Sequence, residues 1–243
     1  PNTDFNGNDT FTFTANDGQT NSAPATANIT ITAVNDAPTF TSGGNVTHLE
    51  TDGPYNQVWA TNISAGAANE TGQNLSFSIL SNDNSALFST QPTIDSSGTL
   101  SFEAVANTSG TANLTVNLTD DGGTANGGAD TSATVNLTIT ITDVNDPPSF
   151  TAGADQTNNE DAGAITVNGW ATGISAGPPD EAGQTLTFNI TANDNPSLFS
   201  AGPSVAANGD LSYTPSSDAT GVANITLELM DDGGTANGGN DTS

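Results

Sequence analysis

The chain has 243 residues and a formal net charge of −27, because 27 Asp and Glu residues stand against no Lys, no Arg and a single His. This balance argues against nucleic acid and anionic membrane surfaces as partners, since binding to either depends on Lys and Arg side chains. The absence of Cys excludes disulfides and thiolate metal sites, so any ion that holds the fold together must be bound through oxygen atoms.

No stretch of the sequence contains the roughly 20 apolar residues that a membrane-spanning helix needs. No basic and apolar signal segment opens the chain. We expect both ends to be cuts in a longer polypeptide. Direct membrane insertion is therefore not expected, and the excess of carboxylates suggests that divalent cations compensate the charge.

Short runs of alternating apolar and polar residues follow one another along the chain. Val, Ile, Phe and Thr dominate these runs, and Gly, Asn, Asp and Pro clusters separate them. A period of two indicates half-buried antiparallel strands. The expected strands lie at 10–14, 27–32, 75–80, 113–119, 134–142 and 185–190.

The sequence repeats itself at an interval of about one domain. Residues 120–132, DDGGTANGGADTS, return as DDGGTANGGNDTS at 231–243, and Trp59 and Trp170 lie 111 positions apart. The linkers VNDAP at 34–38 and VNDPP at 144–148 mark the boundaries. They divide the chain into 1–35, the C-terminal part of a first repeat, 36–145, a complete repeat, and 146–243, a repeat lacking its last strand.

Several strands in roughly 110 residues predict an immunoglobulin-like sandwich for each repeat. The expected fold class is all-β, with tandem Greek-key β-sandwich domains arranged end to end. Trp59 and Trp170 are expected to pack in the core, with stacking on a sugar as the alternative. The sequence offers neither a Ser nucleophile motif nor a second His or a Cys that could act with His48 in a catalytic triad or a zinc site, so the chain is not expected to be an enzyme.

The linkers and strands together resemble cadherin-like, Ig-like calcium-binding tandem repeats of giant RTX-type bacterial surface adhesins. The segment PNTDFNGNDTFTFTANDGQTNSAPATANITITAVNDAP at 1–38 resembles the closing half of such a repeat. The resemblance implies Ca²⁺ at each junction between domains, held by an early Glu, an L-x-x-E motif, a D-x-N-D linker and acidic residues of the next domain. Six to eight oxygen ligands suit this ion.

Position by position, the resemblance implies two sets of calcium ligands. The set for the second junction is Glu50, Glu103, Asp143, Asn145, Asp146, Asp180, Glu181, Asp231 and Asp232. The set for the first junction is Asn35, Asp36, Glu70, Asp120 and Asp121. Ordinary turns remain the alternative for the linkers and for the DDGG segments, because Asn, Asp and Gly favour turns.

Three departures from the family pattern matter, and the two at the first junction predict that it binds fewer or weaker ions than the second. Ala33 stands where the first linker would need Asp, and Asn69 replaces one acidic residue beside Glu70. In the last repeat, Tyr213 and Thr214 occupy the place of the L-x-x-E glutamate.

The resemblance implies a structural extender of an extracellular, cell-surface adhesin or fibre. Its partners would be calcium ions and neighbouring repeats of the same polypeptide, and other domains would reach a cell-surface or glycan target. Two alternatives stay open. One is a glycan- or protein-binding module, and the other is a filament or surface-layer subunit that polymerises by strand exchange.

Overall fold

The computed structural model describes residues 2–243, which form two compact units. The first unit contains the described residues up to His48 together with Gly53–Ala104 and Thr111–Thr140. The second contains Leu49–Asp52, Val105–Gly110 and Ile141–Ser243. Strands and one-turn 3₁₀ helices account for all regular structure among residues 2–243, which confirms the all-β prediction.

The first unit begins with an antiparallel hairpin of β1 (Gly7–Phe13) and β2 (Ala25–Ile31), in which Gly7 lies opposite Ile31. The rings of Phe11 and Phe13 lie 6.1 Å apart, and both side chains are more than half exposed. This hairpin therefore carries apolar side chains that no other strand of the unit covers.

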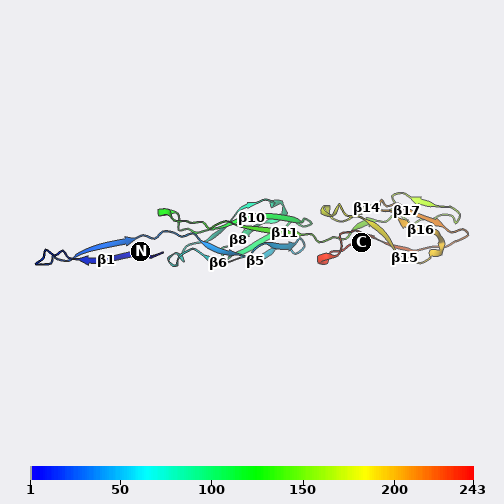
Figure 1. Ribbon diagram of the computed structural model, residues 1–243. Helices are drawn as coiled ribbons and strands as arrows, with labels where there is room; N and C mark the ends of the chain where they lie inside the picture. Colours follow the sequence, from blue (N-terminus) through cyan, green and yellow to red (C-terminus); the bar gives the residue numbers. More distant parts are fainter. Residues whose placement is uncertain (1) are drawn as a thin grey trace. The chain divides into compact units, whose positions relative to one another are not determined.

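The strands that follow build a β-sandwich (Figure 1). One sheet has the strand order β4-β11-β10-β7, a second has the order β5-β9-β8, and β3 pairs with β6. The elements are β3 (Thr39–Ser42), β4 (Val46–Leu49), β5 (Tyr55–Val58), β6 (Ala60–Ser64), η1 (Ala68–Glu70), β7 (Ser76–Asn82), η2 (Ser85–Leu87), β8 (Phe88–Ile94), β9 (Thr99–Ala104), β10 (Gly110–Thr119), η3 (Ala125–Gly127) and β11 (Val135–Thr142).

The core of this sandwich follows from the alternation in the sequence. Leu137, Ile139 and Ile141 of β11 are at most 1 % exposed, whereas the Thr residues between them face outward. Each such side chain contributes about 1.5–3 kcal/mol on burial. Trp59 is buried, and its indole Nε1 donates to the carbonyl of Gly44 at 2.7 Å, which confirms its predicted place in the core.

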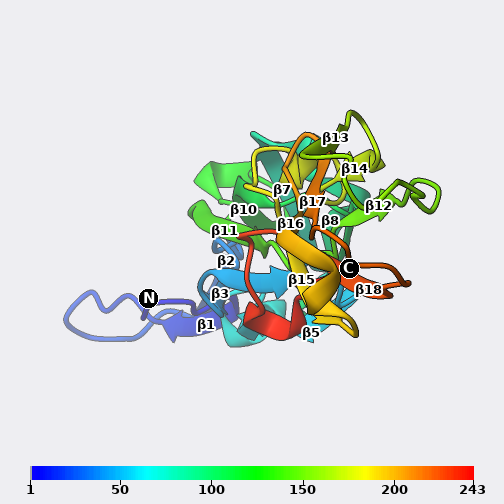
Figure 2. The same cartoon turned by 90° about the vertical axis from the view of Figure 1, so that its right-hand side faces the viewer.

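The last repeat contains shorter sheets. They have the orders β12-β14, β13-β17-β16 and β15-β18, and the C-terminus lies beside β18, where the Ser243 amide donates to the Leu229 carbonyl (Figure 2). The elements are β12 (Ser149–Thr151), β13 (Ile165–Val167), β14 (Thr172–Ser175), η4 (Pro179–Glu181), β15 (Thr187–Asn193), η5 (Pro196–Leu198), β16 (Phe199–Val205), β17 (Leu211–Pro215), β18 (Ile225–Met230) and η6 (Ala236–Gly238).

Candidate metal centre

The second linker is attached to the last repeat by the side chain of Asn145. Its amide nitrogen donates to the Asp231 carboxylate at 3.0 Å and to the carbonyl of Asn240 at 2.8 Å. Its amide oxygen accepts a hydrogen bond of 2.7 Å from Gln184 Nε2. Asn145 is 7 % exposed, so these contacts hold a buried side chain in one orientation.

The residue after Asn145 extends the attachment through its backbone. The amide of Asp146 donates to Glu181 Oε1 at 2.6 Å. Two glycines make room for these polar groups, because a Cβ on Gly233 would lie 1.7 Å from Asn145 Oδ1 and one on Gly177 would lie 1.7 Å from Glu181 Oε2. Glycine at positions 177 and 233 therefore leaves the space that the polar groups of the linker clamp occupy.

The first linker has the same arrangement one repeat earlier. Asn35 Nδ2 donates to Asp120 at 2.9 Å, Gln73 Nε2 donates to Asn35 Oδ1 at 2.6 Å, and the amide of Asp36 donates to Glu70 Oε1 at 3.0 Å. We call each set the linker clamp: Asn35, Asp36, Glu70, Gln73 and Asp120 in the first, and Asn145, Asp146, Glu181, Gln184 and Asp231 in the second.

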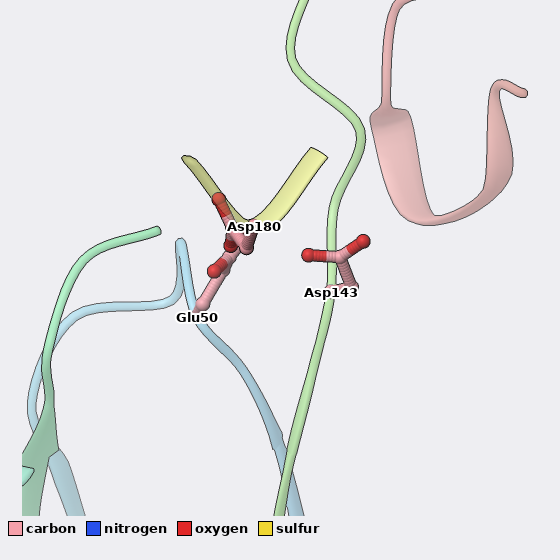
Figure 3. Close-up of side chains that lie close together, drawn as sticks. All are labelled: Glu50, Asp143 and Asp180. Atoms are coloured by element: carbon pink, nitrogen blue, oxygen red, sulfur yellow. The ribbon is translucent and has the colours of Figure 1, made fainter. Parts of the chain in front are cut away.

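Three carboxylates converge beside the second linker clamp. Oxygens of Glu50, which follows β4, Asp143, which follows β11, and Asp180, which lies in η4, all lie within 4.8 Å of one another. Glu50 and Asp180 point toward each other, and one oxygen of Asp143 is directed toward this pair (Figure 3). Glu50 Oε1 also accepts a hydrogen bond of 3.1 Å from the Val144 amide.

The electrostatics of this group favour a cation. Burial raises the pKa of Glu50, and the negative charges of Asp143 and Asp180 raise it further. Burial likewise raises the pKa of Asp143, with Asp180 and Asp146 adding to the shift. The same causes raise the pKa of Glu181. A positive ion would reverse these shifts, since it stabilises the ionised carboxylates.

Buried carboxylate oxygens without a hydrogen-bond partner show whether the residues fit a cation, because a bound cation would satisfy such oxygens. Such an atom costs about 1–3 kcal/mol, and more when it is charged. Among residues 2–243, four of the buried unpartnered oxygens belong to carboxylates of the two predicted ligand sets: Glu50 Oε2, Asp120 Oδ2, Glu181 Oε2 and Asp231 Oδ2. Two of them, on Glu50 and Glu181, lie in or beside the three-carboxylate group, so the donor set fits a metal ion.

The two clamps differ at one backbone position, and the difference explains one of these unpartnered oxygens. In the first clamp, the amide of Ala67 donates to Glu70 Oε2 at 3.0 Å. The equivalent residue of the last repeat is Pro178, which has no N–H group to donate. Glu181 Oε2 therefore stays without a partner. The first glutamate is satisfied by backbone amides, whereas the second keeps one oxygen for another ligand.

The remaining predicted ligands contact neighbouring loops and strands. Asp121 accepts hydrogen bonds of 2.9 and 2.6 Å from the backbone and side chain of Asn74, and Asp232 accepts one of 2.7 Å from the Thr185 amide. The Glu103 carboxylate accepts one of 3.4 Å from the Thr90 hydroxyl.

Sequence reasoning missed Gln73 and Gln184, which hold the two linker asparagines. Their signal is the Gly-Gln dipeptide that recurs at 72–73 and 183–184. A neutral amide at a repeated position points to a hydrogen bond more than to an ion.

Comparison with known proteins identifies the class of fold. A family model described as bacterial Ig domain matches residues 1–31. Mouse protocadherin-24 EC1-3 superposes with a TM-score of 0.51 at 16% identity, covering 97% of this chain and 77% of that chain. Mouse cadherin-23 EC22-24 superposes with a TM-score of 0.49 at 19% identity, covering 92% of this chain and 68% of that chain. A search of curated protein sequences finds no significant match.

The sheet topology and the likeness to mouse protocadherin-24 EC1-3 show a cadherin-like, Ig-like β-sandwich fold. None of the helical segments in residues 2–243 has the length and apolar character of a membrane span.

Proposed function

We propose that the chain is a structural extender of an extracellular adhesin or surface fibre, and that calcium ions make its repeat junctions rigid. The observation that carries the proposal is the group of Glu50, Asp143 and Asp180, whose oxygens lie within 4.8 Å of one another in a chain with no Lys or Arg. Without a cation, three negative charges at this spacing repel one another.

Calcium suits this donor set better than a transition metal. All available ligands are carboxylate, amide and carbonyl oxygens, and Ca²⁺ accepts six to eight of these in flexible geometry. Glu50, Asp143 and Asp180 would hold the ion, with Glu181 Oε2 as a further donor. Once bound, the ion supplies positive charge that compensates the carboxylates and joins the three chain segments that carry them.

The proposal also includes the repeat boundaries that are expected from the sequence, because they place the three carboxylates in different parts of the chain. Glu50 lies in the repeat 36–145 and Asp180 in the repeat 146–243, while Asp143 lies in the linker between them. An ion on these residues would hold successive repeats in a fixed relation. The nearly identical loops 120–132 and 231–243 support a repeated structural role, because recognition loops would be expected to vary from repeat to repeat.

We place the protein at the cell surface in an RTX-type adhesin, with calcium ions and neighbouring repeats as its partners and without enzymatic activity. Other domains of the parent protein would contact the cell-surface or glycan target.

Calcium titration and small-angle scattering test the proposed function together. We expect calorimetry to show calcium binding that Mg²⁺ imitates poorly, and we expect scattering in excess chelator to show a less extended, more variable particle than in millimolar Ca²⁺. Asp180→Asn should weaken binding, because it removes one of three converging charges. Asp218→Asn is the matched control, since Asp218 is exposed on a loop of the same unit and its positive φ of 54° suits Asn.

Two results would reject the proposed function. One is calcium binding that Asp180→Asn and Asp218→Asn reduce equally. The other is a scattering profile that does not change between calcium and chelator.

A further inference from the structure

Each of the two nearly identical loops, 120–132 and 231–243, contains the dipeptide Asn-Gly. An asparagine before a glycine is chemically labile, because glycine has no side chain to hinder the attack of its own backbone nitrogen on the asparagine side chain. The chain has five such dipeptides, which begin at Asn6, Asn126, Asn168, Asn208 and Asn237. The structure distinguishes the two in the repeated loops from the others.

Asn126 lies in a segment where this reaction meets little resistance. It belongs to η3, a single 3₁₀ turn whose three residues are all exposed. Its backbone is left-handed, with a φ of 57°, so the turn departs from helical geometry at Asn126 itself. The Asn126 side chain makes no hydrogen bond with any of residues 2–243. A single exposed turn opens readily, and its opening allows the glycine nitrogen to reach the side chain.

The dipeptides outside the repeated loops are held in place. Asn208 donates from its side chain to the Asp210 carboxylate at 2.7 Å, and its side-chain oxygen accepts from the Asp210 amide at 3.2 Å. The amide of the glycine after Asn168 donates to the same carboxylate at 2.7 Å. The glycine after Asn6 is paired in the β1–β2 ladder. In each case one of the two reacting groups is restrained.

We propose that Asn126 and Asn237 are sites of spontaneous conversion to isoaspartate and aspartate. The backbone nitrogen of the following glycine bonds to Cγ of the asparagine, the Cγ–Nδ2 bond breaks, and Nδ2 leaves as ammonia with the proton that the glycine nitrogen loses. Water then opens the five-membered ring, at the main-chain carbonyl to give isoaspartate or at Cγ to give aspartate. One water is consumed and one ammonia is released, so the reaction needs no enzyme, metal or oxidant.

The conversion occurs beside the residues that hold the first linker. Ala129 donates its amide to the Asn35 carbonyl at 3.0 Å, and its carbonyl accepts from Asn35 Nδ2 at 2.6 Å. A Cβ on Gly128 would lie 3.1 Å from the backbone nitrogen of Asn35, so the loop lies directly against the linker. Isoaspartate adds one carbon atom to the main chain just before these contacts, and both products add a negative charge. The conversion therefore loosens the linker clamp.

The second loop repeats these contacts. The amide of Asn240 donates to the Asn145 carbonyl at 2.9 Å, and its carbonyl accepts from Asn145 Nδ2 at 2.8 Å. Asn237 has a φ of 56° and is exposed, as Asn126 is. Both linker clamps thus carry a site at which they loosen with age. The reaction does not use the candidate metal site, so this inference goes beyond the proposed function and is tested separately from it.

Peptide mapping by mass spectrometry, on the chain aged in mildly alkaline buffer, tests the chemistry. We expect a mass gain of about one dalton at Asn126 and Asn237 at a rate at least about tenfold above that at Asn208, where two hydrogen bonds must first break. Asp210→Ala should raise the rates at Asn168 and Asn208 and leave the rate at Asn126 unchanged. Equal rates at all five asparagines, or an Asn126 that stays unmodified, overturn the inference.

Hydrogen exchange on the aged chain tests the effect on the linker clamp. The Ala129 amide should lose protection as Asn126 is converted. Asn126→Gly should keep this protection, because glycine cannot form the ring and adopts a positive φ without strain. Asn208→Gly is the matched control: it removes an Asn-Gly dipeptide from another loop, and its Ala129 amide should lose protection as in the unaltered chain. Full protection of Ala129 in a chain whose Asn126 has been converted overturns the assigned effect.

Discussion

Ala67 and Pro178 occupy equivalent positions in successive repeats. The difference between them determines whether Oε2 of the neighbouring glutamate has a hydrogen-bond donor. Ala67 donates its amide to Glu70 Oε2, whereas Pro178 leaves Glu181 Oε2 buried without a partner. The second difference, Asn69 against Asp180, adds a charge at the same end of the repeat. Together with Ala33, which stands where the second linker has Asp143, these substitutions separate a glutamate satisfied by backbone hydrogen bonds from a group of carboxylates suited to a cation.

We expect Pro178→Ala to weaken calcium binding about three- to tenfold, because the restored amide would occupy the oxygen that the ion needs. The same change should raise the stability of the ion-free protein by about 1 kcal/mol. Calorimetry and thermal melting measure the two effects. Pro179→Ala is the control for the altered entropy of the unfolded chain. Equal affinities for the two variants would contradict this account of Glu181.

The carboxylates of the candidate site predict an unusual dependence of stability on pH in the absence of metal. Burial, aided by the charges of Asp143 and Asp180, raises the pKa of Glu50 above its ordinary value of 4.5. A group with a raised pKa in the folded state stabilises the fold below its unfolded pKa, and this contribution is lost as pH rises through the folded pKa.

We therefore expect the melting temperature in excess chelator to rise as pH falls from 7 toward 5. Saturating calcium should flatten this rise, since the ion stabilises the ionised form. Below about pH 4 the trend should reverse, because exposed carboxylates such as Asp83 and Asp194 have pKa values lowered by hydrogen bonds from Asn113 and Asn224 and lose those bonds on protonation. A melting temperature that falls steadily from pH 7 to pH 5 in chelator would contradict the prediction.

The convergence of Glu50, Asp143 and Asp180 could be predicted at the residue scale, because each was carried over from a family motif. The roles of Gln73 and Gln184 could not. Their effect depends on the orientation of a linker asparagine, which only the folded chain fixes.

The linker clamp is an element in which backbone space matters as much as hydrogen bonding. A Cβ at Gly233 would lie 1.7 Å from Asn145 Oδ1, so we expect Gly233→Ala to displace the linker and to destabilise the last repeat by about 1–3 kcal/mol. Chemical denaturation measures the change. Gly183→Ala is the matched control, because nothing lies within 4 Å of its added Cβ. If both variants unfold at the same denaturant concentration, the clamp does not contribute to stability.

The strand pattern was predictable where apolar and polar residues alternate. The expected strand at 134–142 corresponds to β11 (Val135–Thr142), and the one at 113–119 lies within β10 (Gly110–Thr119). Strands β8 and β16 were not expected, because Pro92 and Pro203 interrupt their alternation. Both prolines lie at register shifts, where the ladder does not need their missing amides.

The net charge of the whole molecule predicts how its melting temperature depends on salt. With a net charge of −27 and no Lys or Arg, the folded chain repels itself at every distance that solvent ions do not screen. Raising NaCl from about 0.1 M to 1 M shortens the screening length from about 10 Å to about 3 Å. We expect this change to raise the melting temperature in chelator, and to raise it less in calcium. A salt effect of equal size in both conditions would show that bound ions do not relieve the repulsion.

The two linker clamps share the hydrogen bonds of the linker asparagine and of the residue after it, whereas within residues 2–243 a group of converging carboxylates is found beside the second clamp and not beside the first. In the proposed function, the clamp fixes the linker against the repeat that follows it, and the carboxylates determine how strongly the joint responds to calcium. Because different side chains hold the linker and bind the ion, mutation can change the ion affinity of one joint without changing the fold on either side of it. Under the proposed function, a long array of such repeats would combine joints that stiffen at different calcium concentrations along a single fibre.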